Sequence, residues 1–214
     1  MPRIRGASIE EHHEMVWADL AEAMRQLLLE RDYDSINMGH IAAGAGLARN
    51  TLYNYAGDKS ALVLALTRRV GRPTVERVAA IGARSADPAA ERMREIIAAV
   101  LEAFMDSVTQ LMLRPFPEVP KGPDSPFHAI VVEVENVVRA GIAREEFRDV
   151  GDVHLAVELL SGVLRAGAER IGRDPAAFAA TVRAAQEIVL ASVIRRPGEG
   201  SSAGLQHAPH AAVE

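Results

Sequence analysis

The sequence has 214 residues, of which 49% are hydrophobic and 25% are charged, a balance typical of a globular protein with a substantial core. It contains no cysteine, which excludes a disulfide framework and a thiolate metal site. The net charge of −5 argues against a protein that coats nucleic acid non-specifically.

Neither a membrane span nor a secretory signal is expected. We find no apolar run that approaches the roughly 18–20 residues a membrane helix needs. The first 14 residues carry charge but no apolar stretch follows them. We therefore expect a cytoplasmic location and no membrane partner.

Hydrophobic periodicity predicts helices from the N-terminus onward. The apolar residues from Trp17 to Leu28 recur at helical spacing and predict a helix over about residues 10–31. Two very short helices follow, one over about 38–45 with Asn37 as N-cap and one over about 49–55. Gly46 lies at the turn between them. Asp58 can cap a longer helix over about 59–70.

Longer helices are predicted beyond Pro73. Asp87 and Pro88 form an N-cap followed by a first-turn proline, and they open a helix whose apolar stripe continues to Leu111. Residues 115–126 contain five prolines and predict a loop. The valine-rich stretch after Phe127 predicts a helix, with a strand as the alternative. Helices over about 152–172 and 174–194 close the fold.

Residues 36–62 carry the clearest functional pattern. Two short helices separated by a glycine turn predict a helix-turn-helix, whose second helix can enter the DNA major groove. Arginine and asparagine suit base edges, whereas threonine and tyrosine hydroxyls suit phosphates. The candidate DNA-contacting residues are Asn37, Arg49, Asn50, Thr51, Tyr53, Asn54, Tyr55 and Lys59. Arg3 and Arg5 lie on an N-terminal arm that can reach the minor groove or be disordered.

The spacing of these residues resembles the DNA-binding domain of the TetR family over about residues 10–62. The matching positions are Ile41-Ala42, Ala45-Gly46, Thr51-Leu52-Tyr53, Tyr55, Lys59 and Leu62. The resemblance implies an all-α homodimer of about nine helices, often a repressor, whose C-terminal helices pair as a four-helix bundle. It also implies phosphate contacts for Thr51, Tyr53, Tyr55 and Lys59, and base contacts for Arg49, Asn50 and Asn54.

Two positions depart from the family pattern. Ala48 stands where the family has a serine or threonine N-cap, and Ala56 stands where it has a phenylalanine. Losing the cap costs about 0.5–2 kcal/mol, which tertiary packing can offset. The missing ring leaves either a compensating neighbour, such as Tyr55 or Leu52, or looser coupling between the DNA-binding helices and the rest.

Apolar residues in the C-terminal part predict a ligand pocket and a dimer interface. The candidate pocket residues flank the proline-rich loop and include flexible methionines, although plain core is the alternative. They are Phe104, Met105, Val108, Met112, Phe116, Phe127 and Val131. The last two helices carry surplus apolar surface, which indicates dimerisation through Leu155, Leu159, Val163, Val182, Ile188 and Val189.

No pattern in the sequence indicates catalysis. The histidines lack metal-ligand spacing with a carboxylate partner, and no nucleophile motif or phosphate loop is present. Glu133 and Glu135 are two residues apart, so on a helix they cannot act as an acid–base pair. We expect neither an enzyme nor a metal site, and no cofactor.

These observations predict an all-α fold with three segments. Residues 1–58 are expected to form a three-helix DNA-binding domain with a flexible arm over 1–9. Residues 59–195 are expected to form a helical ligand-binding and dimerisation domain, and 196–214 a disordered tail. The predicted function is a repressor released from a palindromic double-stranded operator by a small hydrophobic or amphipathic effector. The alternatives are a ligand-independent or activating DNA-binding dimer, or a small-molecule binding module that has lost DNA binding.

Overall fold

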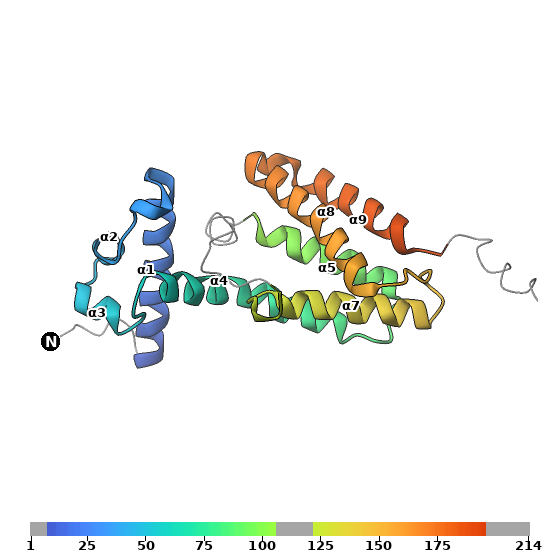
Figure 1. The fold of residues 1–214 in the computed structure, drawn as a ribbon, viewed down its shortest axis with the longest axis horizontal. Coiled ribbons are helices and arrows are strands. Elements are labelled where there is room, and N and C mark those ends of the chain that lie inside the picture. Colours follow the sequence, from blue (N-terminus) through green and yellow to red (C-terminus); the bar gives the residue numbers. More distant parts are fainter. Residues whose placement is uncertain (1–7, 106–121, 196–214) are drawn as a thin grey trace, which may run out of the picture.

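Helices make up most of the computed structural model, which describes residues 8–105 and 122–195 (Figure 1). The α-helices are α1 (Ile9–Glu30), α2 (Met38–Gly44), α3 (Arg49–Tyr53), α4 (Lys59–Gly82), α5 (Ala89–Ala103), α7 (His128–Ala143), α8 (Val153–Arg173) and α9 (Phe178–Val193). The 3-10 turns are η1 (Tyr33–Ser35), η2 (Gly122–Asp124) and η3 (Pro175–Ala177). The predicted all-α class is confirmed, and the strand alternative after Phe127 is wrong because α7 forms there.

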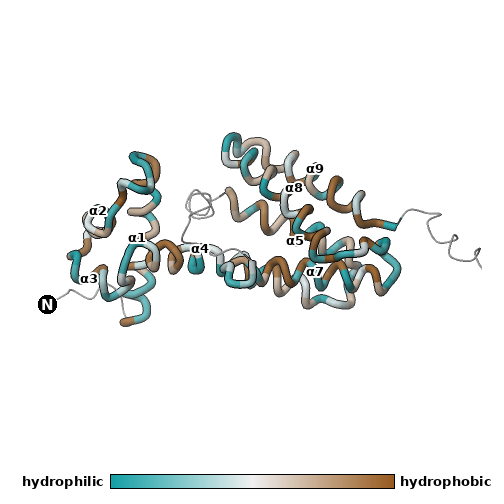
Figure 2. The backbone as a smooth tube through the Cα atoms, viewed as in Figure 1, coloured by the Kyte–Doolittle hydropathy of each residue, from teal (hydrophilic) through white to brown (hydrophobic). Residues whose placement is uncertain are grey.

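Two separate cores organise the described helices. In Figure 1, α1, α2 and α3 gather at one end, and α4 leads from them to the bundle of α5, α7, α8 and α9. Hydrophobic and hydrophilic residues alternate along these helices in Figure 2, as expected when each helix buries one face. The N-terminal core contains Val16, Leu20, Met24, Ile41, Leu52, Leu62, Val63 and Leu66 among others. The C-terminal core contains Val78, Ile81, Met93, Ile96, Ile97, Leu101, Val137, Val138, Phe147, Val189 and Val193 among others.

The division between the two cores lies within α4. Leu62, Val63 and Leu66 pack in the N-terminal core, although the sequence placed residues from 59 onward in the second domain. Val78 and Ile81, farther along the same helix, pack in the C-terminal core. The boundary between the two cores therefore differs from the predicted domain boundary at 58/59, because the first part of α4 packs in the N-terminal core and its last part packs in the C-terminal core.

The helix α4 is longer than predicted and passes through Pro73. The sequence suggested an end near Val70, but the helix continues to Gly82. Proline lacks an N–H and normally breaks a helix interior. Here Pro73 is exposed, so water can bind the backbone carbonyl of Arg69 that the missing N–H leaves without its helical partner.

The start of α5 also differs from the prediction. Pro88 is the N-cap residue and has no side-chain capping bond, so Asp87 does not cap the helix. The carboxylate of Glu146, from the loop after α7, accepts the Ala89 N–H at 2.6 Å instead. Arg144 donates to the carbonyls of Ser85 and Asp87 at 2.9 and 3.1 Å, and these bonds hold the same loop in place.

The described part of α5 ends earlier than its apolar stripe suggested. Its last helical residue is Ala103, and Phe104 is the C-cap. The predicted continuation to Leu111 lies outside the described residues, as do the proline-rich loop up to residue 121 and the tail from 196. Of the arm predicted over 1–9, residues 1–7 also lie outside the described residues, whereas Ser8 caps α1 and Ile9 is its first residue.

The last two helices begin close to the predicted starts, and an aspartate side chain caps each start. Asp152 accepts the Leu155 N–H at the start of α8, and Asp174 accepts the Ala176 N–H at the start of η3. One stretch, Pro175–Val193, is long and apolar enough to cross a membrane by length and composition alone. The stretch includes the charged residues Arg183 and Glu187. Within the fold, Ala185, Val189, Leu190 and Val193 of this stretch are buried.

Candidate nucleic-acid interface

The turn between α2 and α3 is defined by caps and one left-handed glycine. The Asn37 side chain accepts the His40 N–H at 3.0 Å and so begins α2. Gly46 has φ 65°, a conformation that glycine adopts without a steric cost. The Leu47 N–H donates to the Ala42 carbonyl at 2.8 Å, which closes the turn. These bonds fix the angle at which α3 leaves α2.

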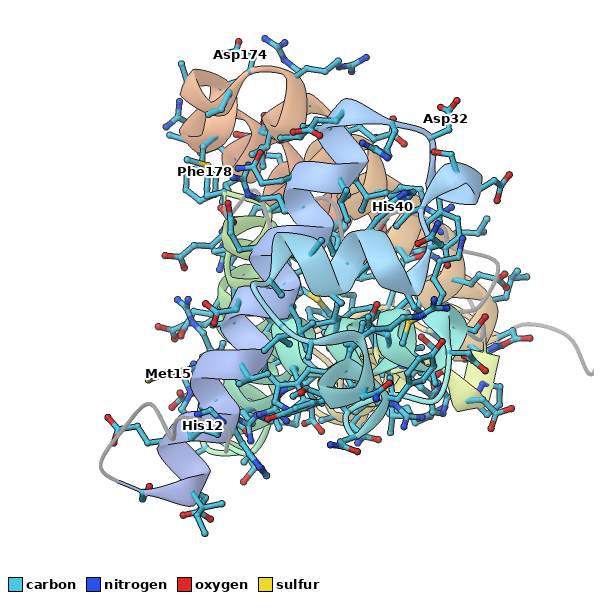
Figure 3. The ribbon with its side chains drawn as sticks, turned by 90° about the vertical axis from the view of Figure 1, so that its left-hand side faces the viewer. His12, Met15, Asp32, His40, Asp174 and Phe178 are labelled. Carbon is cyan, nitrogen blue, oxygen red and sulfur yellow. The ribbon has the colours of Figure 1, made fainter. Side chains whose placement is uncertain are left out.

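The short helix α3 has one buried and one exposed side. Leu52 is 0% exposed and anchors α3 in the N-terminal core, together with Ala56 just after the helix. Arg49, Asn50, Tyr53 and Asn54 are exposed on the other side. Positions i, i+1, i+4 and i+5 share one face of a helix, so these four side chains can meet a groove together. Figure 3 views the molecule from this end, with His12 of α1 and His40 of α2 labelled.

The N-cap of α3 lacks a side-chain bond, as the sequence indicated. Ala48 offers only its backbone carbonyl, which accepts the N–H groups of Thr51 and Leu52 at 2.9 and 3.2 Å. The first N–H groups of α3 therefore have no side-chain acceptor at the cap. The helix depends on the packing of Leu52 for its position.

Arg49 and Tyr53 form a contact along the exposed face. The Arg49 guanidinium donates to the Tyr53 hydroxyl at 3.3 Å and lies 5.8 Å from the centre of its ring. The two residues are one helical turn apart, so the contact holds both side chains on the same side of α3. Because the contact already restricts both side chains, each loses less conformational entropy when it binds DNA.

Two predicted phosphate contacts are engaged within the chain. The Lys59 ammonium donates to the Tyr33 carbonyl at 3.0 Å and lies 3.9 Å from the centre of the Tyr33 ring. Tyr55 is half-buried, and its ring meets Trp17 edge-on at 5.4 Å between centroids. Tyr55 therefore connects the end of α3 to α1, and Lys59 connects the start of α4 to the turn at Tyr33. Thr51 is half-buried.

A cluster that the sequence did not reveal surrounds Tyr55. The His13 ring lies 5.6 Å from that of Tyr55, and the Arg69 guanidinium lies 4.9 Å from the centre of the Trp17 ring. Arg69 also binds the Glu14 carboxylate, which lowers the pKa of Glu14 below its ordinary value. The helical spacing of Glu14 and Trp17 was visible, but Arg69 is too distant in sequence to pair with them by pattern.

Comparison with known proteins supports the family assignment for this domain. Residues 20–66 match the family model described as bacterial regulatory proteins, tetR family. This stretch spans α2 and α3 together with parts of α1 and α4. The HTH-type transcriptional regulator AlkX of Mycobacterium tuberculosis is 37% identical over 57 residues, a stretch that spans 27% of this chain and 27% of AlkX.

Solved structures resemble the fold over most of the chain. A putative tetR family transcription regulator from Shewanella sp. PV-4 has a TM-score of 0.69 at 20% identity, covering 85% of this chain and 99% of that one. FadR from Bacillus subtilis, in complex with stearoyl-CoA, has a TM-score of 0.66 at 18% identity, covering 84% and 98%. The chain therefore has the fold of TetR-family transcriptional regulators.

Beyond the TetR-family domain, the predicted pocket residues do not form one described site. Val108, Met112 and Phe116 lie outside the described residues. Phe104 and Val131 pack against the C-terminal core, whereas Met105 is 44% exposed. Phe127 places its ring against Gly71 of α4.

The predicted dimer residues divide into exposed and buried ones. Leu155, Leu159 and Ile188 are 50%, 69% and 55% exposed, which leaves three large apolar side chains on the outer surface of α8 and α9. Val163 and Val182 are half-buried. Val189 is 2% exposed and belongs to the C-terminal core of the single chain. Periodicity marked it as apolar but could not tell a core face from an outer one.

Two buried charges in the C-terminal part lie apart from these groups. The Glu135 carboxylate binds Nδ1 of His154 and the Arg139 guanidinium, each at 2.7 Å. The hydrogen bond to His154 lowers the pKa of Glu135, and the same bond raises the pKa of His154. Arg92 is buried and donates to the Gly82 carbonyl at 2.9 Å, which caps the end of α4. Over residues 8–105 and 122–195, no three His, Asp or Glu side chains gather where a metal ion could bind.

Proposed function

We propose that this chain is a sequence-specific DNA-binding transcription regulator, a homodimeric repressor released from its operator by a small hydrophobic or amphipathic molecule. The observation that carries the proposal is the exposed face of α3, where Arg49, Asn50, Tyr53 and Asn54 lie together on a helix that Leu52 anchors. Such a face presents donors and acceptors to base edges and phosphates. The TetR-family domain match supports this role for α3.

The dimer is proposed from the exposed apolar residues of α8 and α9. Exposing the apolar side chains of Leu155, Leu159 and Ile188 to water is unfavourable. A second copy of the same face can cover them symmetrically. Two-fold symmetry would bring two α3 helices to successive major grooves about 34–36 Å apart, which requires a palindromic operator. A monomeric mass at micromolar concentration would contradict this part.

The effector is proposed to enter the helices beyond α4. The similar FadR structure holds stearoyl-CoA, and the apolar residues Phe127 and Val131 at the start of α7 fit a hydrophobic or amphipathic molecule. Coupling is reciprocal, so a molecule that weakens DNA binding must itself bind more weakly to the DNA-bound protein.

Selection from random double-stranded DNA tests the proposal and identifies the operator in the same experiment. The purified chain should enrich a motif with two related half-sites. Asn50→Ala should lose or alter the preferred bases, because Asn50 is exposed on α3, whereas Asn136→Ala, on α7, should leave the motif unchanged. Failure to enrich any motif at low salt would favour the small-molecule binding module that does not bind DNA.

A further inference from the structure

A polar groove lies where α5 packs against α9 in the C-terminal bundle. It has a volume of about 300 Å³ and is lined by Arg94 of α5 and by Arg183, Gln186, Glu187 and Leu190 of α9. In Figure 1 both helices belong to the bundle and lie away from α3. The groove is therefore separate from the candidate nucleic-acid interface.

The spacing of the α9 residues brings one mixed face of that helix to the groove. Gln186, Glu187 and Leu190 follow Arg183 by three, four and seven residues, so the four side chains share one face. Leu190 is buried, whereas Arg183 and Glu187 are exposed, so this face runs from the core to the surface. The groove thus has an apolar inner part and charged groups at its opening.

A hydrogen bond connects the two helices beside these charges. Nε2 of Gln186 donates to the backbone carbonyl of Arg94 at 3.0 Å, across 92 residues of sequence. The bond attaches α9 to α5 at the point where the side chain of Arg94 leaves its helix. It therefore fixes the spacing of the two walls from which Arg94 and Arg183 extend.

Both arginines in the groove keep their guanidinium donors available. Within the described part of the chain, neither Arg94 nor Arg183 forms an ion pair or a side-chain hydrogen bond. Arg84, in the same bundle, instead binds Glu95 at 2.7 Å. A guanidinium matches two oxygens of a phosphate or carboxylate with parallel hydrogen bonds. Two such groups beside one groove favour an anion with several oxygens.

The third charged group of the groove selects among such anions. The Glu187 carboxylate lines the groove and forms no ion pair with any described residue. An ionised carboxylate only accepts hydrogen bonds, so it repels an anion that has no proton to donate. Inorganic phosphate retains a P–OH group at neutral pH, whereas sulfate retains no proton. A phosphate monoester also loses its last proton above a pKa of about 6.

We propose that the groove between α5 and α9 is a binding site for inorganic phosphate. Arg94 and Arg183 donate hydrogen bonds to its oxygens, and Glu187 accepts the hydrogen bond of its P–OH group. The ion contacts α5 and α9 at once and so adds a second connection between the two helices.

The proposed phosphate site lies apart from the exposed apolar surface of α9. Ile188 carries that surface and follows Arg183 by five residues, which turns its side chain about 140° away around the helix. A dimer formed through Ile188 therefore leaves the groove open to solvent, and phosphate binding does not require the DNA-binding role of α3.

Calorimetric titration of the purified full chain with sodium phosphate tests the proposal. The titration is run at about pH 7.5, where a monoester is fully ionised, and chloride keeps the ionic strength constant. One phosphate should bind per chain. Sulfate and phenyl phosphate should each bind at least about tenfold more weakly, because neither donates a hydrogen bond to Glu187.

Substitutions at exposed positions assign the binding to the groove. Arg94→Gln and Arg183→Gln should each weaken phosphate binding at least about tenfold, because each removes a charged donor. Glu187→Gln should abolish the preference for phosphate over sulfate, since an amide can donate to either anion. Arg165→Gln removes an exposed arginine of α8 that does not line the groove, and it should bind phosphate as the native chain does.

The proposal is overturned if the native chain binds no phosphate at millimolar concentrations, or if sulfate or phenyl phosphate binds as tightly as phosphate. It is also overturned if either Arg94→Gln or Arg183→Gln retains the native affinity, or if Arg165→Gln loses as much affinity as they do. The titration contains no DNA, so its outcome is independent of whether random-DNA selection enriches a motif.

Discussion

The Lys59 ammonium lies 3.9 Å from the centre of the Tyr33 ring and donates to the Tyr33 carbonyl at 3.0 Å. The two residues are 26 positions apart, and their contact joins the start of α4 to the turn that precedes α2. Lys59, which the family pattern assigns to a phosphate contact, thus also forms a contact within the DNA-binding domain.

Replacing Lys59 with methionine should therefore destabilise the fold as well as weaken DNA binding. A charged hydrogen bond and a cation–π contact are lost, and we expect the free energy of unfolding to fall by about 1–3 kcal/mol. Urea unfolding measures the change. Arg68→Met removes an exposed cation from the same helix and is the matched control; equal losses in both variants would show that the Tyr33 contact contributes nothing.

Restoring the missing cap should stabilise α3. The structure gives Ala48 no side-chain hydrogen bond at the N-cap. Ala48→Ser supplies an acceptor for the free N–H groups of the first turn, and we expect a gain of about 0.5–2 kcal/mol in the free energy of unfolding. Ala18→Ser, at an exposed position in α1, should give no gain. A thermal midpoint unchanged in Ala48→Ser would mean that packing alone fixes α3.

The stability of the C-terminal bundle should depend on pH through His154. Its pKa is raised from the ordinary 6.5 by the hydrogen bond to Glu135, so the contribution of the charged imidazole is complete below 6.5 and is lost as pH rises through the raised pKa. The pKa of Glu135 is lowered from 4.5, so its contribution is complete above 4.5 and is lost as pH falls through the lowered pKa. The pair stabilises the fold most between these two ordinary values.

Urea unfolding at about pH 6 and about pH 8.5 detects this dependence. The native chain should lose more stability over that interval than His154→Gln, which keeps a polar side chain but cannot titrate. An identical loss in the two proteins would show that other groups cause the pH dependence.

The sequence predicted the helices better than their contacts. Periodicity and caps such as Asn37 and Asp58 placed the helix starts because these signals act within one turn. The cap of α5 by Glu146 was missed, since that residue lies 57 positions from Ala89. The continuation of α4 through Pro73 was missed as well, because packing at both ends of α4 outweighs the local proline signal.

The candidate interface shows the same division. The exposed positions of α3 followed from the motif, whose spacing dictates which residues share a face. The inward contacts of Tyr55 and Lys59 could not be predicted, because they depend on where Trp17 and Tyr33 lie in space. The burial of Val189 in the core of the single chain could not be predicted for a related reason, since an apolar period does not say whether a face meets the core or a second chain.

The most direct test of the central claim is the affinity of Arg49→Ala for the selected operator and for a scrambled duplex, measured by fluorescence anisotropy over a range of salt concentrations. If α3 reads DNA, the native chain prefers the operator with a steep salt dependence. Arg49→Ala should lose about 1–3 kcal/mol on the operator and little on the scrambled duplex, because a base contact carries the preference. Equal operator affinities for the native chain and Arg49→Ala, with the same preference over scrambled DNA, would contradict the assignment of Arg49 to base recognition.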